Sequence, residues 1–303
     1  MFIATFIADN ALRADDMLRA RQLMADLGCR TSEPVWLHEG SACDVFYQPP
    51  PAGEDFSTED GVGLGMYRLN GYFEDYDLII QPAATREKRL LIADMDSTMI
   101  TVECIDELAD YAGIKPEIAA ITESAMRGEL DFEGALDARV ALLAGLDEGA
   151  IERCLAERVS LMPGARTLVR TMKARGAHTI LVSGGFTRFA EPVADVIGFD
   201  RTIANRLLIE DGRLTGRVAK PIVGADTKLA TLEAAIVERG IDRSATLAVG
   251  DGANDLPMIR AAGLGVAYHA KPVVAEAAAA RIEHGDLTTL LYAQGIARKD
   301  WVE

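Results

Sequence analysis

Two acidic motifs in this sequence have residue types and spacing that suit phosphoryl chemistry. They are Asp94-Met-Asp-Ser-Thr98 and Gly250-Asp-Gly-Ala-Asn-Asp255. Asp94 could attack a phosphorus centre as a nucleophile, and Asp96 could exchange protons with the leaving and attacking oxygens. Together with Asp251 they form an all-oxygen donor set, which suits Mg²⁺ rather than Zn²⁺. For either motif alone, a solvated turn after a strand is the alternative.

Two further segments could bind an anion. Ser183-Gly-Gly185 precedes a predicted helix, and its small residues would let backbone N–H groups approach negative charge. Lys228 lies in the opening turn of another predicted helix, where a cation is unfavourable unless an anion is close. The alternatives are a flexible turn at the glycines and an exposed Lys228 that pairs with Asp226. Asn254 and Asp255 follow Asp251 by one turn, where they could orient the groups that bind a ligand.

The elements that must position these motifs alternate along the chain from residue 90 onward. Apolar runs that read as strands lie at Leu90–Ala93, Thr179–Ser183, Thr246–Val249 and Leu264–Tyr268. Helical patterns lie near 164–175, 187–197, 225–239, 254–262 and 271–279. Buried strands separated by helices indicate an α/β fold, a Rossmann-like doubly wound parallel sheet. Asp211-Gly212 predicts a hairpin turn within residues 205–216.

Two other regions do not follow this alternation of strands and helices. Residues 105–160 read as three or four helices without a strand, and an insertion at a strand end suits a lid over the site. Residues 1–85 read as a small α+β module with one helix over residues 10–27, strand candidates, and a Pro- and acid-rich loop at Pro49–Gly63. We therefore expect an N-terminal domain over 1–85, a core over 86–104 and 161–303, and a helical cap over 105–160.

One helix of the expected cap carries a basic residue inside an apolar stripe. Asp131 is placed to begin this helix, and Phe132, Leu136, Arg139 and Leu143 then share one face. An arginine in such a stripe needs a partner, and a substrate carboxylate could bind it in bidentate fashion. A salt bridge to an acid of the cap, or a side chain that reaches water, is the alternative.

Composition excludes several classes of protein. The 303 residues carry a formal net charge of −16, which disfavours nucleic acid and anionic membranes as partners. Four scattered cysteines without a CxxC pair indicate neither a disulfide framework nor a structural zinc site. The N-terminus does not resemble a secretory signal, and no apolar run approaches the ~20 residues that span a bilayer. We expect a cytoplasmic protein.

Taken together, the motifs resemble those of the haloacid dehalogenase-like phosphatases, and they occur in the same order. The longer string DMDSTMITVECIDELA is similar to the phosphoserine phosphatase family within that superfamily. The resemblance covers roughly residues 88 to 295, about two-thirds of the chain. It implies a haloacid dehalogenase-like core with an inserted helical cap, and a Mg²⁺-dependent phosphatase that works through an aspartyl-phosphate.

The resemblance also implies a role for each matching residue. Asp94 would be the nucleophile and Asp96 the general acid and base. The Asp94 carboxylate, the Asp96 backbone carbonyl and the Asp251 carboxylate would hold Mg²⁺. The substrate-binding residues would be Ser183, Gly184 and Lys228 for the phosphoryl group, Asn254 to position it, Glu103 for the substrate ammonium, Arg139 for its carboxylate, and Phe132 and Met126 as apolar lid residues.

The expected reaction is hydrolysis of O-phospho-L-serine to L-serine and phosphate, the last step of serine biosynthesis. One alternative is a phosphatase or phosphotransferase of the same fold that acts on another small phosphate, such as phosphothreonine or phosphohomoserine. An alternative of another class is an amino-acid-sensing regulatory protein, because residues 1–85 resemble small ligand-binding (ACT-like) domains. Serine regulation and homodimer formation through this module are hypotheses; a second helix, which such a domain should have, cannot be recognised.

Overall fold

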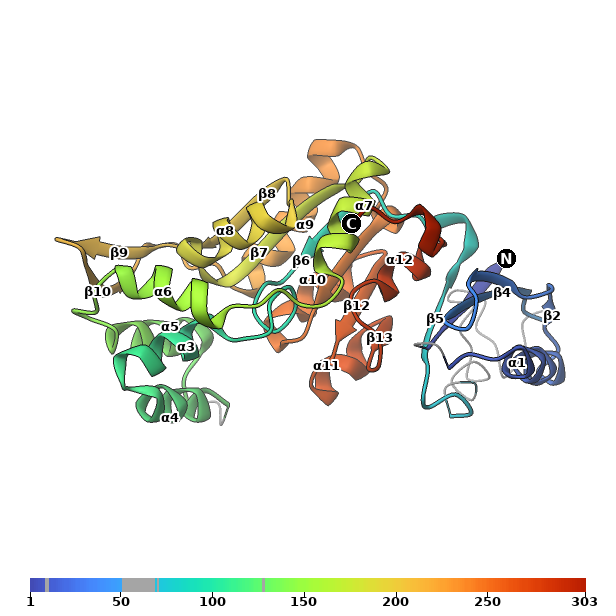
Figure 1. Ribbon diagram of the computed structural model, residues 1–303, viewed down its shortest axis with the longest axis horizontal. Coiled ribbons are helices and arrows are strands. Elements are labelled where there is room, and N and C mark those ends of the chain that lie inside the picture. The colour runs from blue at the N-terminus through green and yellow to red at the C-terminus, as the bar shows by residue number, and fades with distance from the viewer. Residues whose placement is uncertain (9–10, 51–68, 70, 127–128) are drawn as a thin grey trace.

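The computed structural model describes residues 1–8, 11–50, 69, 71–126 and 129–303. An antiparallel sheet lies at one end, a parallel sheet fills the middle, and a group of helices lies at the other end (Figure 1). Most of the loop predicted at Pro49–Gly63 falls outside the described residues.

The N-terminal sheet is built around β1 (Phe2–Ile7), which pairs with β4 (Ala42–Gln48) and β5 (Asp77–Pro82). The short strands β2 (Arg30–Thr31) and β3 (Val35–His38) pair with β4. One face packs against α1 (Ala14–Asp26). The helix predicted from residue 10 begins only at Ala14, where the Asp16 carboxylate accepts a hydrogen bond from Arg13 N and so caps the first turn.

The central sheet has six parallel strands in the order β13-β12-β11-β6-β7-β8, which confirms the predicted Rossmann-like architecture. Their bounds are β6 Leu90–Ala93, β7 His178–Phe186, β8 Arg201–Asn205, β11 Thr246–Gly250, β12 Leu264–Tyr268 and β13 Ala280–Ile282. The edge strands β8 and β13 were not predicted. β13 begins at Ala280, so the helix predicted over 271–279 ends early, at Ala277.

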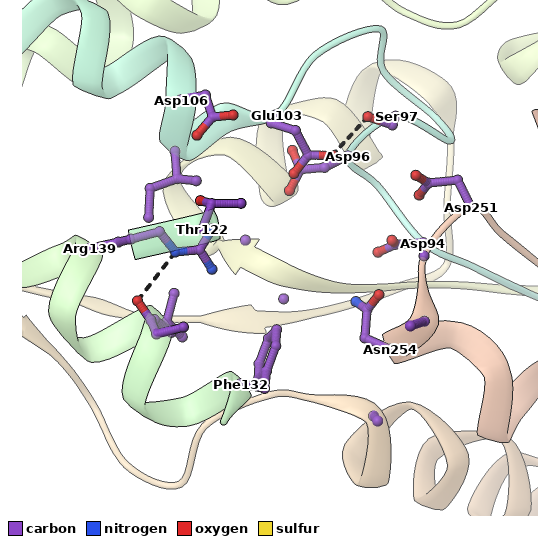
Figure 2. Close-up of a pocket in the computed structure, with 18 of the residues that line it drawn as sticks. Asp94, Asp96, Ser97, Glu103, Asp106, Thr122, Phe132, Arg139, Asp251 and Asn254 are labelled. Atoms are coloured by element: carbon purple, nitrogen blue, oxygen red, sulfur yellow. Dashed lines mark hydrogen bonds between the residues drawn. The ribbon is translucent and has the colours of Figure 1, made fainter. Parts of the chain in front are cut away.

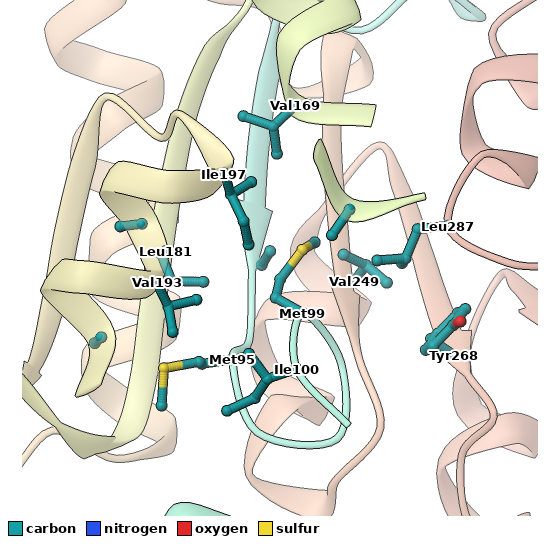
Figure 3. Close-up of a cluster of buried hydrophobic side chains, with 14 of the residues drawn as sticks. Met95, Met99, Ile100, Val169, Leu181, Val193, Ile197, Val249, Tyr268 and Leu287 are labelled. Carbon is teal, nitrogen blue, oxygen red and sulfur yellow. The ribbon is translucent and has the colours of Figure 1, made fainter. Parts of the chain in front are cut away.

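Helices cover both faces of this sheet. They are α7 Ala165–Ala174, α8 Thr187–Ile197, α9 Ala225–Arg239, α10 Leu256–Ala261, α11 Pro272–Ala277 and α12 Thr289–Ala293. Alternate residues of β6 enter different cores: Leu91 packs with side chains of α7, α8 and α12, and Leu90 packs with side chains of α9 and α10. Figure 3 shows part of the first core, where Val169, Val193 and Ile197 gather beside the central strands. Burying each such side chain contributes about 1.5–3 kcal/mol.

Four helices separate β6 from α7, in the region where three or four were predicted. They are α3 Cys104–Ala112, α4 Lys115–Met126, α5 Phe132–Ala141 and α6 Gly149–Arg158, and we call them the helical insertion. Asp131 caps α5 as expected, because its Oδ1 accepts a hydrogen bond from Gly134 N at 2.7 Å. A separate hairpin of β9 (Leu207–Glu210) and β10 (Arg213–Val218) turns at Asp211-Gly212, both with positive φ.

The second face of the N-terminal sheet packs on the core rather than facing solvent. Arg86 makes an ion pair with Asp44 at 2.8 Å and donates to Ala293 O at 3.3 Å. Asp77 accepts hydrogen bonds from the backbone N–H groups of three successive residues, 283–285. The chain between β5 and β6, where the N-terminal sheet meets the core, is therefore part of a packed, hydrogen-bonded interface.

Candidate active site

The strand order brings the predicted motifs together at one edge of the central sheet. β6 lies between β11 and β7, so the chain leaves three neighbouring strands at Asp94, Asp251 and the Ser183–Phe186 segment. In parallel sheets, ligands bind outside the carboxyl ends of the strands, where the order of connections reverses. A cavity of about 840 Å³ opens there, between the central sheet and the helical insertion (Figure 2).

Lys228 forms the base of the site. Its side chain is fully buried, and its Nζ lies 2.6 Å from both Asp94 Oδ1 and Asp255 Oδ1. Burial alone would lower the pKa of Lys228, but the two adjacent carboxylates hold that pKa above its usual value. The ammonium is therefore charged and fixed beside Asp94. This geometry contradicts the alternative of an exposed lysine paired with Asp226.

Asp96 lies on the same loop as Asp94, and its Oδ1 accepts a hydrogen bond from Cys104 N at 3.1 Å. Burial, and then the charges of Glu103 and Asp94, raise the pKa of Asp96 to about 8. A carboxyl group with such a pKa can hold a proton near neutral pH and release it to a developing alkoxide. Asp96 therefore has the properties of a general acid.

The two glycines after Ser183 leave space for the side chains of Asp96 and Phe132. β7 extends to Phe186, so Ser183-Gly-Gly185 lies inside an irregular strand end rather than in a turn. A Cβ on Gly185 would lie 2.7 Å from Asp96 Oδ2, and one on Gly184 would lie 3.1 Å from the Phe132 ring. Ser183 is fully buried, and its Oγ accepts a hydrogen bond from Gly185 N at 2.8 Å. Gly184 and Gly185 line the cavity, whereas Ser183 lies behind them.

The opposite wall of the cavity belongs to the helical insertion. Glu103 immediately precedes α3, and its Oε1 accepts a hydrogen bond from Ser97 Oγ at 2.8 Å. Arg139 and Phe132 both lie on α5 and line the cavity (Figure 2). Arg139 Nε donates to Ala135 O of its own helix. Burial lowers the pKa of Arg139, and the charges of Asp106 and Glu103 oppose that shift. The cavity that contains Asp94 is thus also lined by a second carboxylate, Glu103, and by a guanidinium, Arg139.

The donor set fits a divalent cation. Asp94, Asp251 and Asp255 each offer a carboxylate oxygen, and these atoms lie within 4.8 Å of one another. Burial, and then the charges of Asp94 and Glu103, raise the pKa of Asp251 to about 6. A bound cation would offset the unfavourable free energy of ionising this carboxyl group. Both Asp255 oxygens are already used, by Lys228 Nζ and by Gly252 N. Asp94 and Asp251 are therefore the better ligands, and oxygen donors suit a hard cation.

Most of the residues predicted for the site meet at this cavity. It is lined by Asp94, Asp96, Glu103, Phe132, Arg139, Gly184, Asp251 and Asn254, while Lys228 and Ser183 are buried beneath it. The side chain of Met126 lies outside the described part of the chain.

Sequence reasoning assigned no role to Ser97, Thr98, Asp106 or Lys271. Ser97 has φ +54° and holds Glu103, and Thr98 Oγ1 donates to Asp251 Oδ1 at 3.4 Å. Asp106 and Lys271 line the cavity. Ser97 and Thr98 belong to the first motif, and this position is the sequence signal that could have placed them in the site. The other two residues come from separate elements, and nothing local to them in the sequence marks them.

Comparison with known proteins agrees with this arrangement. The family model described as haloacid dehalogenase-like hydrolase matches residues 91–260, more than half of the chain. The chain therefore belongs to the haloacid dehalogenase-like hydrolase family. A phosphoserine phosphatase of Streptomyces coelicolor is 50% identical over 215 residues, which cover 71% of this chain and 52% of that protein.

The chain is also similar to solved structures. A HAD family hydrolase from Salmonella enterica has a TM-score of 0.82 and 30% identity, and the match covers 97% of this chain and 98% of that one. A structure described as a phospho-aspartyl intermediate analogue of phosphoserine phosphatase has a TM-score of 0.63 and 40% identity, covering 68% of this chain and 98% of that one. The chain spans about half the length of the first curated relatives that it matches, 52% and 54%.

Within the described residues, no helix combines the length and the apolar character that crossing a bilayer requires.

Proposed function

We propose that this protein is a Mg²⁺-dependent phosphatase that hydrolyses O-phospho-L-serine to L-serine and phosphate through an aspartyl-phosphate on Asp94. The observation that carries the proposal is one cavity lined by Asp94 and Asp96 together with Glu103 and Arg139. The relatives named phosphoserine phosphatase support the same substrate.

The first chemical step uses Asp94 and Asp96. Asp94 attacks phosphorus, the bond to the serine oxygen breaks, and Asp96 transfers its proton to that oxygen. In the second step Asp96 takes a proton from water, which attacks the phosphorus of the aspartyl-phosphate and regenerates Asp94. Lys228, fixed 2.6 Å from Asp94 Oδ1, places positive charge next to the reacting group without having to reorganise.

Recognition of the amino acid is assigned to the walls of the cavity. The Glu103 carboxylate would bind the substrate ammonium, and the Arg139 guanidinium would bind its carboxylate in bidentate geometry. Gly184 would bind the phosphoryl oxygens, with Asn254 positioning them. Ser183, expected to share this role, lies behind the glycines, where its Oγ accepts the hydrogen bond from Gly185 N and so supports the backbone that faces the phosphate. Phe132 rests against Gly184 and Gly224, where it can exclude water from the reacting group.

Mg²⁺ would be held by the carboxylates of Asp94 and Asp251 and by the backbone carbonyl of Asp96. When bound, it offsets negative charge on the phosphoryl oxygens.

The domain assignment belongs to the same proposal. The helical insertion would be a cap on a core formed by residues 86–104 and 161–303, because α5 forms a wall of the cavity. Residues 1–85 would be an ACT-like domain, supported by the described antiparallel sheet with α1 on one face.

The decisive experiment measures phosphate release from O-phospho-L-serine with Mg²⁺, and again after chelation by EDTA. We expect activity only with the metal, and activity at background for Asp94→Asn, with deamidation excluded by mass spectrometry. Phosphothreonine, phosphohomoserine and a non-amino-acid phosphate form the comparison panel. If phosphoserine ranked far below the non-amino-acid phosphate in kcat/KM, the roles of Glu103 and Arg139 would be wrong.

A further inference from the structure

The β9–β10 hairpin follows the core strand β8 in sequence, yet it is attached to the helical insertion. Its backbone bonds to the segment between α5 and α6: Gly145 N donates to Leu214 O at 2.8 Å, Leu214 N to Leu146 O at 2.9 Å, and Glu148 N to Gly212 O at 2.9 Å. Neither hairpin strand pairs with the central sheet. Figure 1 shows the hairpin extending beside α5 and α6.

Side chains continue this attachment along α5. Leu214 and Val218 of β10 are buried in the same core cluster as Leu136 and Val140 of α5. Near the other end of the hairpin, Lys220 Nζ makes an exposed ion pair with Asp137 Oδ2 at 2.7 Å. The hairpin therefore contacts α5 along the helix that carries both Phe132 and Arg139.

Gly216 of β10 lies close to the end of α5. Its φ is +76°, and a Cβ there would lie 3.1 Å from Ala141 O and 2.9 Å from Ala144 Cβ. The backbone of α5 cannot give way as a flexible side chain could. A side chain at residue 216 would consequently push the last turn of α5, which carries Arg139, away from the hairpin.

We propose that the β9–β10 hairpin sets the position of α5, with Gly216 as a positioning residue for recognition of the substrate carboxylate by Arg139. This inference rests on the proposed function. Among the hydrogen bonds of the described residues, the Arg139 side chain donates only to the carbonyl of Ala135, one turn back on the same helix. The placement of the guanidinium therefore follows the placement of α5.

The test compares Gly216→Ala with Gly176→Ala. Gly176 has a similar φ of +85°, but nothing lies within 4 Å of a Cβ placed there, so this control carries the same backbone cost without the contact. For Gly216→Ala we expect KM for O-phospho-L-serine to rise about tenfold, with kcat much less affected. For O-phosphoethanolamine, which keeps the phosphate and ammonium but lacks the carboxylate, kcat/KM should match that of wild type.

Hydrogen exchange provides a readout that does not depend on activity. Amides of α5 should exchange faster in Gly216→Ala than in wild type, while those of α9 should not change. If Gly216→Ala does not fold, Lys220→Glu tests the same contact: KM for phosphoserine should rise about threefold, as expected for an exposed ion pair, and adding Asp137→Lys should restore it.

The outcomes distinguish a failure of the proposed function from a failure of the role assigned to the hairpin. A wild-type protein that releases no phosphate from phosphoserine contradicts the proposed function. An active wild type for which Gly216→Ala behaves like Gly176→Ala, or loses activity equally on both substrates, overturns the role of the hairpin.

Discussion

At the level of single residues, the site depends on a buried ammonium shared by two carboxylates. Lys228 is charged although it is fully buried, because Asp94 and Asp255 each lie 2.6 Å from its Nζ. Removing one partner of such a buried ion pair leaves an uncompensated charge, which is strongly destabilising. Asp255 then acts through Lys228: it fixes the ammonium that in turn contacts the proposed nucleophile.

Asp255→Asn should therefore lower kcat by about 10- to 100-fold, the usual effect of losing a group that orients a functional side chain. KM for phosphoserine should change much less, because Asp255 does not line the cavity. Steady-state phosphate release measures both. Asp226→Asn is the matched control, because Asp226 is an exposed acid in the first turn of α9, the helix that carries Lys228. An equal loss in both variants would show that Lys228 does not depend on Asp255.

The ion pair of Lys228 could not be predicted from local sequence. The unfavourable place of a lysine at a helix start predicts a nearby anion, and two carboxylates do lie 2.6 Å from its Nζ. Which anion it was depended on the strand order, because Asp255 is 27 residues away along the chain. Asp226, closer in sequence, offered a simpler partner that the fold does not use.

At the level of elements, the end of β7 is shaped by the space that Asp96 occupies. Gly185→Ala would place a Cβ 2.7 Å from Asp96 Oδ2 and 3.0 Å from Ser183 Oγ. We expect near-background phosphatase activity with the far-ultraviolet circular dichroism of the wild type, because the clash is confined to the strand end. Gly176→Ala again serves as control. Wild-type kcat/KM in Gly185→Ala would rule out a tight fit between this strand and Asp96.

Elements with strong apolar patterns were predictable, and edge elements were not. Leu264–Tyr268 and Thr187–Ile197 were predicted to the residue, because a buried strand and an amphipathic helix each have a clear period. β8 is only partly buried at the sheet edge, so its pattern is weak. β13 lies in an alanine-rich segment with helix propensity, and its pairing with β12 overrides that propensity.

At the level of the whole molecule, Lys88 couples stability to pH where the N-terminal sheet meets the core. Its Nζ donates to Thr85 O at 2.7 Å and to Ser244 O at 2.9 Å, and only 4% of the residue is exposed. Burial lowers the pKa of Lys88 from 10.5 to about 8. Between these values the unfolded chain binds more protons than the folded chain, so this group makes the free energy of unfolding rise with pH.

Lys88→Met removes this titration. From pH 8 to 10.5 the free energy of unfolding of the wild type should therefore rise relative to that of the variant, by about 3 kcal/mol in total. Urea unfolding at several pH values measures the difference, with Lys115→Met, at an exposed lysine, as control. A difference between wild type and Lys88→Met that does not vary with pH would contradict the lowered pKa of Lys88 in the folded chain.

The packed second face of the N-terminal sheet has a consequence for how this chain can evolve. Ile7, Ala42 and Ile79 share a core cluster with Leu290 and Leu291 of α12, so the sheet acts as a cover for the core around the central sheet. Losing residues 1–85 would uncover apolar surface and leave Arg86 without its carboxylate partner. Selection for a stable catalyst would thus preserve the N-terminal sheet even in a lineage in which that sheet bound no effector.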